Sequence, residues 1–324
     1  MRVKDSIVVV TGASSGIGRA TALAFAGGRA AVVLAARREQ ALDEVARECE
    51  AAGGQALAVP TDVTDPKAVD ELARRAVERF GRIDVWVNNA ALTLFAPFLD
   101  APLEDFRRVL DVNVMGYVHG ARAALPQMKE QGAGVIVNVS SIAGVVPQPY
   151  THAYCMSKAA IKAFSASLRQ ELMLEGSPSR NIKVVSVLPG TIDTPFFDDT
   201  ANYTGREAKA MPPVYSPERV ARTIVNLVRV PRREMTVGPM ARNLAMQAKM
   251  TPGLVEKMMA LQVDKTHLSR TKPAPATEGN LHEPASGSGS VHGRWNGKRR
   301  TAIRRAMSGT ALAGVVTVVR QRRR

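Results

Sequence analysis

The sequence predicts an α/β fold in which a doubly wound parallel sheet of about seven strands carries helices on both faces. Three observations support this fold: apolar runs alternate with helical stretches, a glycine-studded turn joins the first run to a helix, and a second apolar run follows that helix. The alternation covers about 240 residues, which is ample for one large core. In order, the runs are IVVV, AAVVLAA, QALAVPTDV, IDVWVNNA, GVIVNVSS, IKVVSVLPG and MTVG.

The first predicted strand, residues 7–10, leads into a turn that suits a bound phosphate. Gly12, Gly16 and Gly18 permit a tight turn and a close approach of backbone to ligand. The helix that begins there offers free N–H groups and the positive end of its dipole. The spacing is Gly-x-x-x-Gly-x-Gly, not the common Gly-x-Gly-x-x-Gly. Strand, turn and helix in this order still predict a dinucleotide-binding turn.

The second predicted strand, residues 30–36, ends at Arg37 and Arg38, where an acidic residue usually accepts hydrogen bonds from an NAD ribose. No carboxylate at this tip repels a 2′-phosphate, and two guanidiniums are placed to bind one. NADP(H) is therefore the preferred cofactor, with NAD(H) as the alternative. The competing interpretation is that both arginines are ordinary surface charges at the start of a helix.

A Ser, a Tyr and a Lys follow in the second half of the sheet. Ser141 ends the strand GVIVNVSS, and Tyr154 and Lys158 lie four residues apart in a stretch of helix formers, so both should share one helix face. A nearby ammonium is expected to lower the pKa of a phenol from its usual value of about 10. The three groups predict proton exchange with a substrate oxygen. The alternative is a half-buried aromatic beside a solvated lysine stem.

The last elements of the sheet surround a predicted substrate pocket. The strand IKVVSVLPG ends in a loop at the carboxyl edge, where ligands bind in this architecture. Residues 191–215 combine Pro, Gly, charges and two Phe, as expected for a mobile cover or for a long surface connection. A short strand at residues 235–238 would complete the sheet. Candidates for the opposite pocket wall, which suggest a partly apolar substrate, are Phe95, Val145, Gln148 and Tyr150.

The C-terminal part changes in composition. Residues 241–270 are Met-rich and predict a helical extension, whereas residues 271–324 predict a low-order linker and a basic tail. Residues 294–324 hold ten Lys or Arg and no acid, and so supply ten of the net charge of +15. An apolar run at residues 306–319 would reach about 21 Å as a helix, short of a bilayer core of about 30 Å.

The sequence supports three interpretations of this tail to different degrees. A disordered, solvated tail comes first, and weak contact with an anionic membrane surface comes second. Specific nucleic-acid binding is disfavoured because the tail has one aromatic residue and no recognition module.

The chain resembles the short-chain dehydrogenase/reductase family over about its first 195 residues, with weaker similarity to about residue 240. The motifs that carry the resemblance stand in family order: TGASSGIG at residues 11–18, Asp62-Val63, NNAA at residues 88–91, Asn113, Ser141, Tyr154 with Lys158, and PGTIDTP at residues 189–195. The resemblance implies a Rossmann-like domain at residues 1–240.

The resemblance also implies residue roles. Tyr154 would be the catalytic acid/base, Lys158 would tune it and hold the nicotinamide ribose, Ser141 would orient the substrate oxygen, and Asn113 would anchor a water of a proton relay. The implied cofactor-binding residues are Gly12, Ser14, Ser15, Gly16, Ile17, Gly18, Arg37, Asp62, Val63, Asn89, Ala90, Tyr154, Lys158, Pro189, Gly190, Ile192 and Thr194.

These features predict an NADP(H)-dependent oxidoreductase that moves hydride between nicotinamide and a carbonyl/secondary-alcohol pair. The alternative is an NADP(H)-binding regulator or scaffold with little turnover. Family members commonly pair through helices matching residues 102–125 and 153–174, which implies a homodimer or homotetramer. No metal is expected, because the five His form no cluster. Two Cys without ligand spacing and no secretory segment suggest the cytoplasm, with the membrane surface as a further location.

Overall fold

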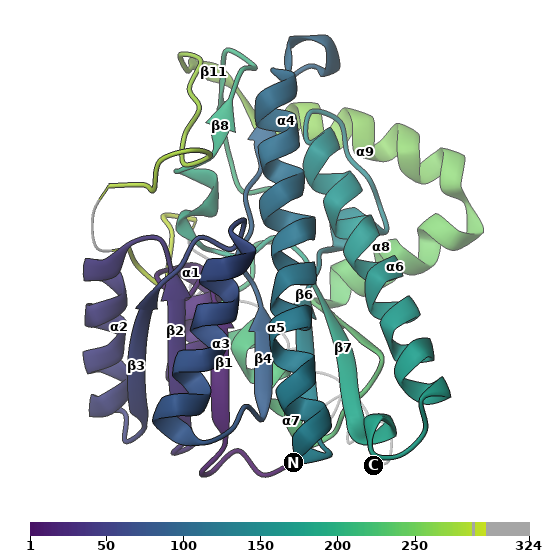
Figure 1. Cartoon of the computed structure of the whole chain (residues 1–324). Coiled ribbons are helices and arrows are strands. Elements are labelled where there is room, and N and C mark those ends of the chain that lie inside the picture. The colour runs from purple at the N-terminus through teal and green to yellow at the C-terminus, as the bar shows by residue number, and fades with distance from the viewer. Residues whose placement is uncertain (287–288, 296–324) are drawn as a thin grey trace, which may run out of the picture.

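The computed structural model describes residues 1–286 and 289–295 and confirms the predicted doubly wound sheet. Parallel strands lie side by side in the order β10-β7-β6-β4-β1-β2-β3 (Figure 1). Their bounds are β1 Ile7–Thr11, β2 Ala31–Ala36, β3 Gln55–Pro60, β4 Val85–Asn88, β6 Gly134–Val139, β7 Ile182–Pro189 and β10 Glu234–Val237.

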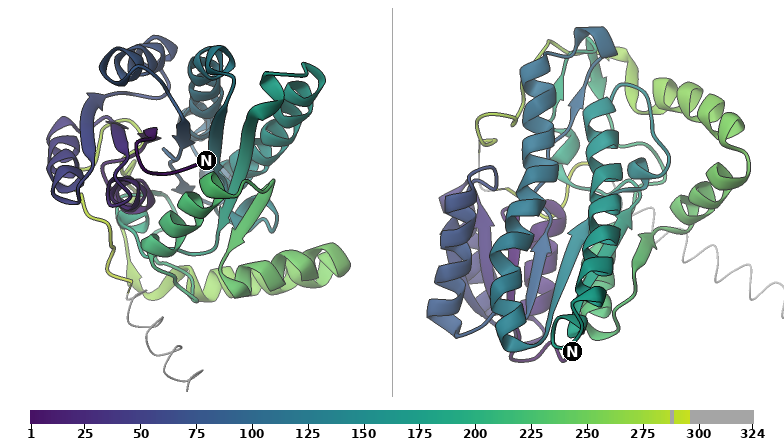
Figure 2. Two further views of the ribbon diagram at one scale, coloured as in Figure 1. Left: turned by 90° about the horizontal axis from the view of Figure 1, so that it is seen from below. Right: turned by 45° about the vertical axis from the view of Figure 1, so that its right-hand side comes forward.

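Helices cover both faces of this sheet (Figure 2). Val8 and Val10 of β1 pack in the cluster that includes α1, α2 and α7, whereas Val9 packs on the other face with α3, α5 and α6. Side chains alternate between the faces of a strand, so a strand covered on both sides is apolar at every position. The helix bounds are α1 Gly16–Ala26, α2 Glu39–Ala51, α3 Pro66–Phe80, α4 Leu103–Leu110, α5 Gly116–Gln131, α6 His152–Leu174 and α7 Pro217–Arg229.

The strand order reverses beside β1, and this reversal places the ligand-binding crevice. From β1 the chain builds outward through β2 and β3, then returns to place β4 on the other side of β1. The connections that leave the carboxyl ends of β1 and β4 therefore diverge to opposite sides of the sheet. In open α/β sheets this divergence leaves a crevice for ligands.

Local sequence signals explain where the helices begin and end, as α3 illustrates. The Asp65 side chain accepts a hydrogen bond from Lys67 N at 2.9 Å, and Pro66 occupies the first turn. Both are favourable at a helix start, where N–H groups lack partners. Gly81 ends the helix in the left-handed conformation, with φ of +82°.

A buried polar chain ties β4 and β6 to α6. Asn88 accepts a hydrogen bond from Trp86 Nε1 at 2.8 Å and donates to Asn138 Oδ1 at 2.9 Å. Asn138 in turn donates to Ser165 Oγ of α6 at 2.9 Å. Since buried polar groups are costly when unpaired, this chain fixes the helix against the sheet in one register. The same helix carries the predicted Tyr-x-x-x-Lys pair.

Beyond the sheet, two helices project to one side: α8 Pro239–Met250 and α9 Pro252–Thr266 (Figure 1). Val255, Met259 and Val263 of α9 are buried together with Val146 in a small apolar cluster. The predicted domain boundaries at residues 240 and 270 stay predictions. Within the described part of the chain, no helix combines the length and the apolar character needed to cross a membrane.

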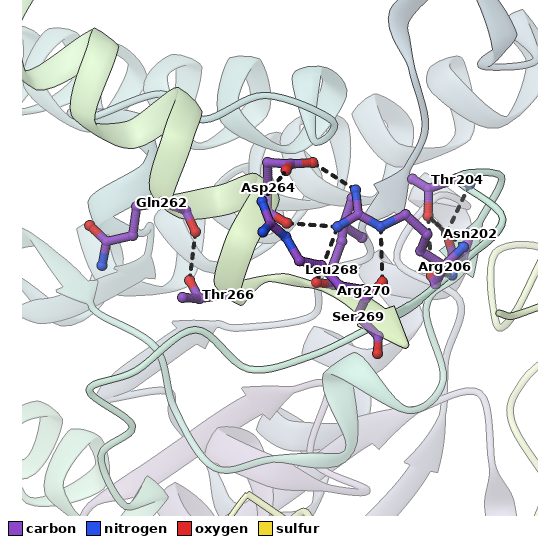
Figure 3. A network of polar contacts seen from close by, with 9 residues as sticks. All are labelled: Asn202, Thr204, Arg206, Gln262, Asp264, Thr266, Leu268, Ser269 and Arg270. Atoms are coloured by element: carbon purple, nitrogen blue, oxygen red, sulfur yellow. Dashed lines mark hydrogen bonds and ion pairs between the residues drawn. The ribbon is translucent and has the colours of Figure 1, made fainter. Parts of the chain in front are cut away.

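Two short strand pairs connect the chain after β7 to the segment after β4 and to the C-terminal part. The pairs are β5 Leu94–Phe95 with β8 Ala201–Asn202, and β9 Arg206–Ala208 with β11 Leu268–Pro273. Arg206 fixes the second pair, because its guanidinium donates to Asp264 Oδ1 at 2.6 Å and to Ser269 O at 2.9 Å (Figure 3). One side chain therefore joins β9, the end of α9 and β11.

Residues 274–286 and 289–295 comprise most of the predicted linker and the start of the predicted basic tail, and they lie against the carboxyl edge of the sheet. The backbone of Thr277 exchanges hydrogen bonds with Asn202, at 2.8 and 3.1 Å. Further along, Ser290 O accepts from Gly16 N at 2.8 Å. A composition rich in Pro, Gly and Ser gave no sign of these contacts. The rest of the predicted basic tail, residues 296–324, with its apolar run and its predicted membrane-surface contact, lies outside the described residues.

Candidate active site

The glycine-rich turn is built as tightly as its sequence predicts. Gly12 and Gly16 have φ of +65° and +54°, which favour glycine. A Cβ at Gly18 would lie 2.0 Å from the Gly12 carbonyl oxygen, so α1 starts directly against the turn. Asn89 Nδ2 donates to Thr11 O at 3.0 Å and to Gly12 O at 3.2 Å, which locks the turn to the end of β4.

A cavity of about 270 Å³ lies at the carboxyl edge of the sheet and collects most of the predicted residues. The ends of parallel strands meet along this edge, so motifs far apart in sequence converge there. Gly18 and Asn113 are not part of the lining. The predicted residues that line the cavity are Gly12, Ser14, Ser15, Gly16, Ile17, Arg37, Asp62, Val63, Asn89, Ala90, Ser141, Tyr154, Lys158, Pro189, Gly190, Ile192 and Thr194.

Ser141, Tyr154 and Lys158 come together in this cavity. A hydrogen bond joins the Tyr154 and Ser141 side chains. Lys158 is 1% exposed, and its Nζ donates to Val139 O at 2.9 Å and to Tyr117 Oη at 3.3 Å. The same nitrogen lies 5.5 Å from the centre of the Tyr154 ring. The helical spacing therefore places the ammonium and the phenol on one face, as predicted.

In the chain alone, the pKa of Tyr154 shifts in the direction opposite to the prediction. Burial raises the pKa of Tyr154 to about 12, although the hydrogen bond with Ser141 opposes the shift. Burial also lowers the pKa of Lys158 to about 7. Both shifts have one physical cause, because a low-dielectric cavity disfavours the phenolate and the ammonium alike. The predicted acidification of Tyr154 by its neighbour is therefore not seen in the chain alone.

Asn113 lies behind the cavity, in a single π-helical turn, Asp111–Met115, between α4 and α5. Its Oδ1 accepts from Leu92 N at 2.7 Å, and its Nδ2 donates to Leu92 O at 2.8 Å and to Ser157 Oγ at 3.0 Å. Such π turns occur often at functional sites. Asn113 thus holds the loop that follows β4 against α6, one residue before Lys158.

At the other end of the cavity, Arg37 and Arg38 line the wall beyond β2. Asp62, beyond β3, accepts from Arg108 Nη2 at 2.8 Å and from Thr64 N at 2.9 Å. Burial opposes ionisation of this carboxyl, but the hydrogen bonds from Thr64 and Arg108 outweigh it and lower its pKa. Asp62 is therefore a neutralised anion, whereas burial lowers the pKa of Arg37 from its high ordinary value.

The segment predicted as a cover, residues 191–215, is tied at several points. Asp193 N donates to Tyr215 O at 2.8 Å, and Tyr215 N donates to Thr191 O at 2.9 Å, so its two ends pair. Between them, β8 pairs with β5 and β9 pairs with β11. The cover is therefore bound both to the segment that follows β4 and to the C-terminal extension.

Apolar side chains wall the cavity beside Tyr154. Phe196 and Phe197 come from the cover, and the ring centre of Phe196 lies 5.7 Å from that of Tyr154. Phe95 and Gln148, both predicted, also line the cavity. The other two predicted wall residues, Val145 and Tyr150, pack outside the lining in the cluster with α9.

His267 is a wall residue that the sequence did not reveal. It follows α9, and its ring centre lies 5.0 Å from that of Phe95 and 5.5 Å from that of Phe197. Burial lowers its pKa to about 4, although a hydrogen bond with Lys209 O opposes the shift. The imidazole is therefore neutral at neutral pH. A lone His after a Met-rich helix carried no sequence signal of this position.

Three further lining residues, Asn280, Pro284 and Ala285, come from the predicted linker. Their types are common in loops, so only the tertiary structure brings them to the cavity. In the part of the chain that is described, no group of three or more His, Cys, Asp or Glu is arranged to hold a metal ion.

Comparisons with known proteins agree with this geometry. The family model described as short chain dehydrogenase matches residues 6–203. An uncharacterized oxidoreductase of Bacillus subtilis (strain 168), YxnA, is 34% identical over 299 residues, covering 92% of this chain and 82% of the relative. A probable oxidoreductase of Mycobacterium tuberculosis (strain ATCC 25618 / H37Rv), EphD, is 37% identical over 273 residues, but the match covers 80% of this chain and only 45% of that longer protein.

Solved structures give the same result. A short-chain dehydrogenase/reductase from Burkholderia phymatum in complex with NAD is similar with a TM-score of 0.72 and 26% identity, over 79% of this chain and 97% of that one. An alcohol dehydrogenase from Thermococcus sibiricus complexed with 5-hydroxy-NADP has a TM-score of 0.63 and 26% identity, over 72% and 96%. With the sheet order, the glycine-rich turn and the family match in agreement, this chain belongs to the short-chain dehydrogenase/reductase family of oxidoreductases.

Proposed function

We propose that this chain is an NADP(H)-dependent oxidoreductase that transfers hydride between nicotinamide and a carbonyl/secondary-alcohol pair, with Tyr154 as acid/base. One observation carries the proposal: a single cavity is lined by the glycine-rich turn at one end and by Ser141, Tyr154 and Lys158 at the other. Such a reaction requires a phosphate-binding turn and a proton-donating group in the same cavity.

The residues fit a dinucleotide. The close contact of Gly18 with the Gly12 carbonyl keeps side chains out of the turn, so α1 can present its N-terminal N–H groups to a phosphate once the bond from Gly16 N to Ser290 O opens. Arg37 and Arg38 support a preference for the 2′-phosphate, because they are the charged groups beyond β2 and the nearby Asp62 is already neutralised by an ion pair. NAD(H) remains the alternative, and the similar solved structures carry NAD in one case and an NADP derivative in the other.

The bound cofactor supplies or accepts the hydride, and the side chains of this protein handle the proton. Ser141 Oγ accepts from Ala143 N at 3.1 Å, and its hydroxyl pairs with that of Tyr154, so a substrate oxygen would bind between the two hydroxyls. In the reduction direction the Tyr154 hydroxyl donates its proton to that oxygen. The high pKa of Tyr154 in the chain alone suits a group that keeps its proton until a charged oxygen develops beside it.

Lys158 and Asn113 support the proton transfer in different ways. With a pKa near 7, the Lys158 amine gains and loses a proton readily at neutral pH. Both amide hydrogens of Asn113 are used by Leu92 and Ser157, so a relay water at Asn113 would bind to an oxygen of this residue. We propose that this water continues the relay from Lys158.

The expected substrate is a partly apolar carbonyl compound or alcohol. Phe95, Phe196, Phe197 and Met211 provide apolar contact, and the neutral His267 adds a polar edge among them. We further expect a homodimer or homotetramer that acts in the cytoplasm. Exposed apolar side chains on the helices implied in pairing support the oligomer.

The decisive test compares wild type with Tyr154→Phe in NADPH oxidation against a panel of aldehydes, ketones and quinones. Loss of the proton donor should lower kcat by about 10²–10⁴-fold while NADPH affinity stays unchanged. Tyr203→Phe, a change outside the cavity, is the matched control. Equal rates in wild type and Tyr154→Phe would exclude the catalytic assignment. Tight NADPH binding without turnover of any substrate would instead favour the regulatory alternative.

A further inference from the structure

The segment after β11 crosses the cofactor end of the cavity. We call residues 274–286 and 289–295 the strap. Figure 1 shows the strap in yellow, descending from β11 toward the upper ends of β2 and α2. Its root is fixed by the Arg206 network (Figure 3) and by the pairing of Thr277 with Asn202. Its far end is held where Trp295 N donates to Asp193 Oδ1 at 2.8 Å.

Arginine side chains donate hydrogen bonds to carbonyl oxygens in the middle of the strap. Arg37 donates from Nη1 to His282 O at 2.6 Å and from Nη2 to Asn280 O at 2.7 Å. Arg108 Nε donates to Leu281 O at 3.1 Å. Hydrogen bonds from a charged donor are the stronger kind. The strap is therefore bound to the same guanidinium that is proposed to recognise the 2′-phosphate.

Burial of an apolar side chain also stabilises the docked position of the strap. Leu281 is fully buried, with 0% exposure, in the core cluster that includes Val63 of the cavity wall. A solvated linker would leave such a side chain in water, whereas burial of a leucine favours the docked position. The strap thus has an apolar anchor between its polar contacts.

Glycines let the strap lie directly on the cofactor turn. A Cβ at Gly289 would lie 2.5 Å from the Ser14 carbonyl oxygen, and Gly289 has φ of +78°. A Cβ at Gly293 would lie 2.4 Å from the Thr194 carbonyl oxygen. Each glycine therefore sits where a side chain would push the strap off a residue of the cavity wall.

The strap roofs part of the cavity and also bonds to the glycine-rich turn. The space of about 270 Å³ is lined by Asn280, Pro284 and Ala285 of the strap and by residues of the turn. Ser290 O accepts from Gly16 N at 2.8 Å, so the strap occupies one N–H at the start of α1. The strap therefore shares the cavity with the turn, and this bond must open when a dinucleotide phosphate binds to that N–H.

We propose that the strap is part of the cofactor site: it closes over the adenosine half of a bound dinucleotide and retains it. This proposal rests on the proposed function, because it assumes that the cavity takes NADP(H). Entry and release of the cofactor then require the strap to lift from Arg37 and from Ser14. Retention follows because the contacts of Leu281 and Arg37 must break before the dinucleotide leaves.

The test uses full-length protein with Gly289→Ala, which strains the backbone and meets the Ser14 carbonyl. Stopped-flow fluorescence gives the NADPH dissociation rate, and titration gives the Kd. We expect dissociation to become faster by about tenfold and the Kd to rise to match. Gly293→Ala, at the other end of the strap, should have the same effect. Gly253→Ala is the control, since its Cβ would enter open space.

Each outcome decides between stated alternatives. An unchanged NADPH dissociation rate in both strap variants would overturn the proposal that the strap retains the cofactor. Tighter NADPH binding in Gly289→Ala would also overturn it, since it would mean that the strap competes with the cofactor. Failure of wild type itself to bind NADPH or NADH would reject both the proposed function and the proposed role of the strap. Binding by wild type without turnover leaves the dissociation comparison fully decisive for the strap.

Discussion

Replacing Lys158 by methionine should stabilise the cofactor-free protein at neutral pH while destroying the proposed activity. Lys158 is buried, and burial lowers its pKa from the ordinary 10.5 to about 7. Between these two values the unfolded chain binds more protons than the folded one, so the stability of wild type rises with pH. At pH 7 the cost of holding this amine in the folded state is about 4 kcal/mol, and near pH 9.5 it has fallen to about 1 kcal/mol.

Methionine removes this cost together with two hydrogen bonds. Lys158 Nζ donates to Val139 O at 2.9 Å and to Tyr117 Oη at 3.3 Å, whereas Val139 O keeps a second donor, the Tyr117 hydroxyl, at 2.9 Å. Loss of the two bonds should cost about 1–3 kcal/mol in total at every pH. The variant should therefore be more stable than wild type by about 1–3 kcal/mol at pH 7. Its advantage should shrink by about 3 kcal/mol on going to about pH 9.5, whatever the exact cost of the two lost hydrogen bonds.

Urea unfolding of cofactor-free wild type and Lys158→Met at the two pH values, followed by circular dichroism, measures this change directly. Lys183→Met, at a solvent-exposed lysine, is the matched control and should show no such pH dependence. A stability difference between Lys158→Met and wild type that stays constant across this pH range would refute the reasoning. That result would mean that the amine is as well solvated in the fold as in the unfolded chain.

Two further predictions concern the cofactor end of the cavity. Arg37→Asp should shift the ratio of NADP to NAD affinity toward NAD by about tenfold or more, measured by titration with both cofactors. Loss of the strap contacts alone would weaken the affinities for both cofactors equally. Arg47→Asp, on the exposed surface of α2, is the control. Gly18→Ala should cost about 1–3 kcal/mol in urea unfolding and weaken NADPH binding, because its Cβ would lie 2.0 Å from a carbonyl oxygen. Gly27→Ala, whose Cβ would make only an ordinary 3.4 Å contact, should change neither quantity, and equal behaviour of these two variants would contradict the packing argument.

Periodicity and turn chemistry were enough to predict the fold. Apolar β-branched runs such as residues 7–10 can be buried only when both faces of the sheet are covered, and the helices between them supply those covers. The same rule brings the ends of strands to one edge. Gly12, Arg37, Ser141 and Ile192 were therefore predicted to lie near one another, and all of them line one cavity.

The electrostatics of the site could not be read from spacing. A spacing of four residues from Tyr154 to Lys158 indicates that the two groups are neighbours, but the sign of each pKa shift depends on how much water reaches them. In the folded chain burial outweighs their attraction, so the phenol becomes a weaker acid and the ammonium a stronger one. Only the packed cavity sets that balance.

The sequence by itself determined the sheet, the glycine-rich turn and the Ser-Tyr-Lys set, because local periodicity and fixed spacings specify which side chains share a face. The tertiary structure alone decided the roof of the cavity. Leu281 and Asn280 are more than 240 residues away from Arg37, and their neighbours read as linker. The contacts form because guanidinium donors and an apolar pocket created by the folded sheet offer that segment better partners than water does, and no local pattern records partners so distant in the chain.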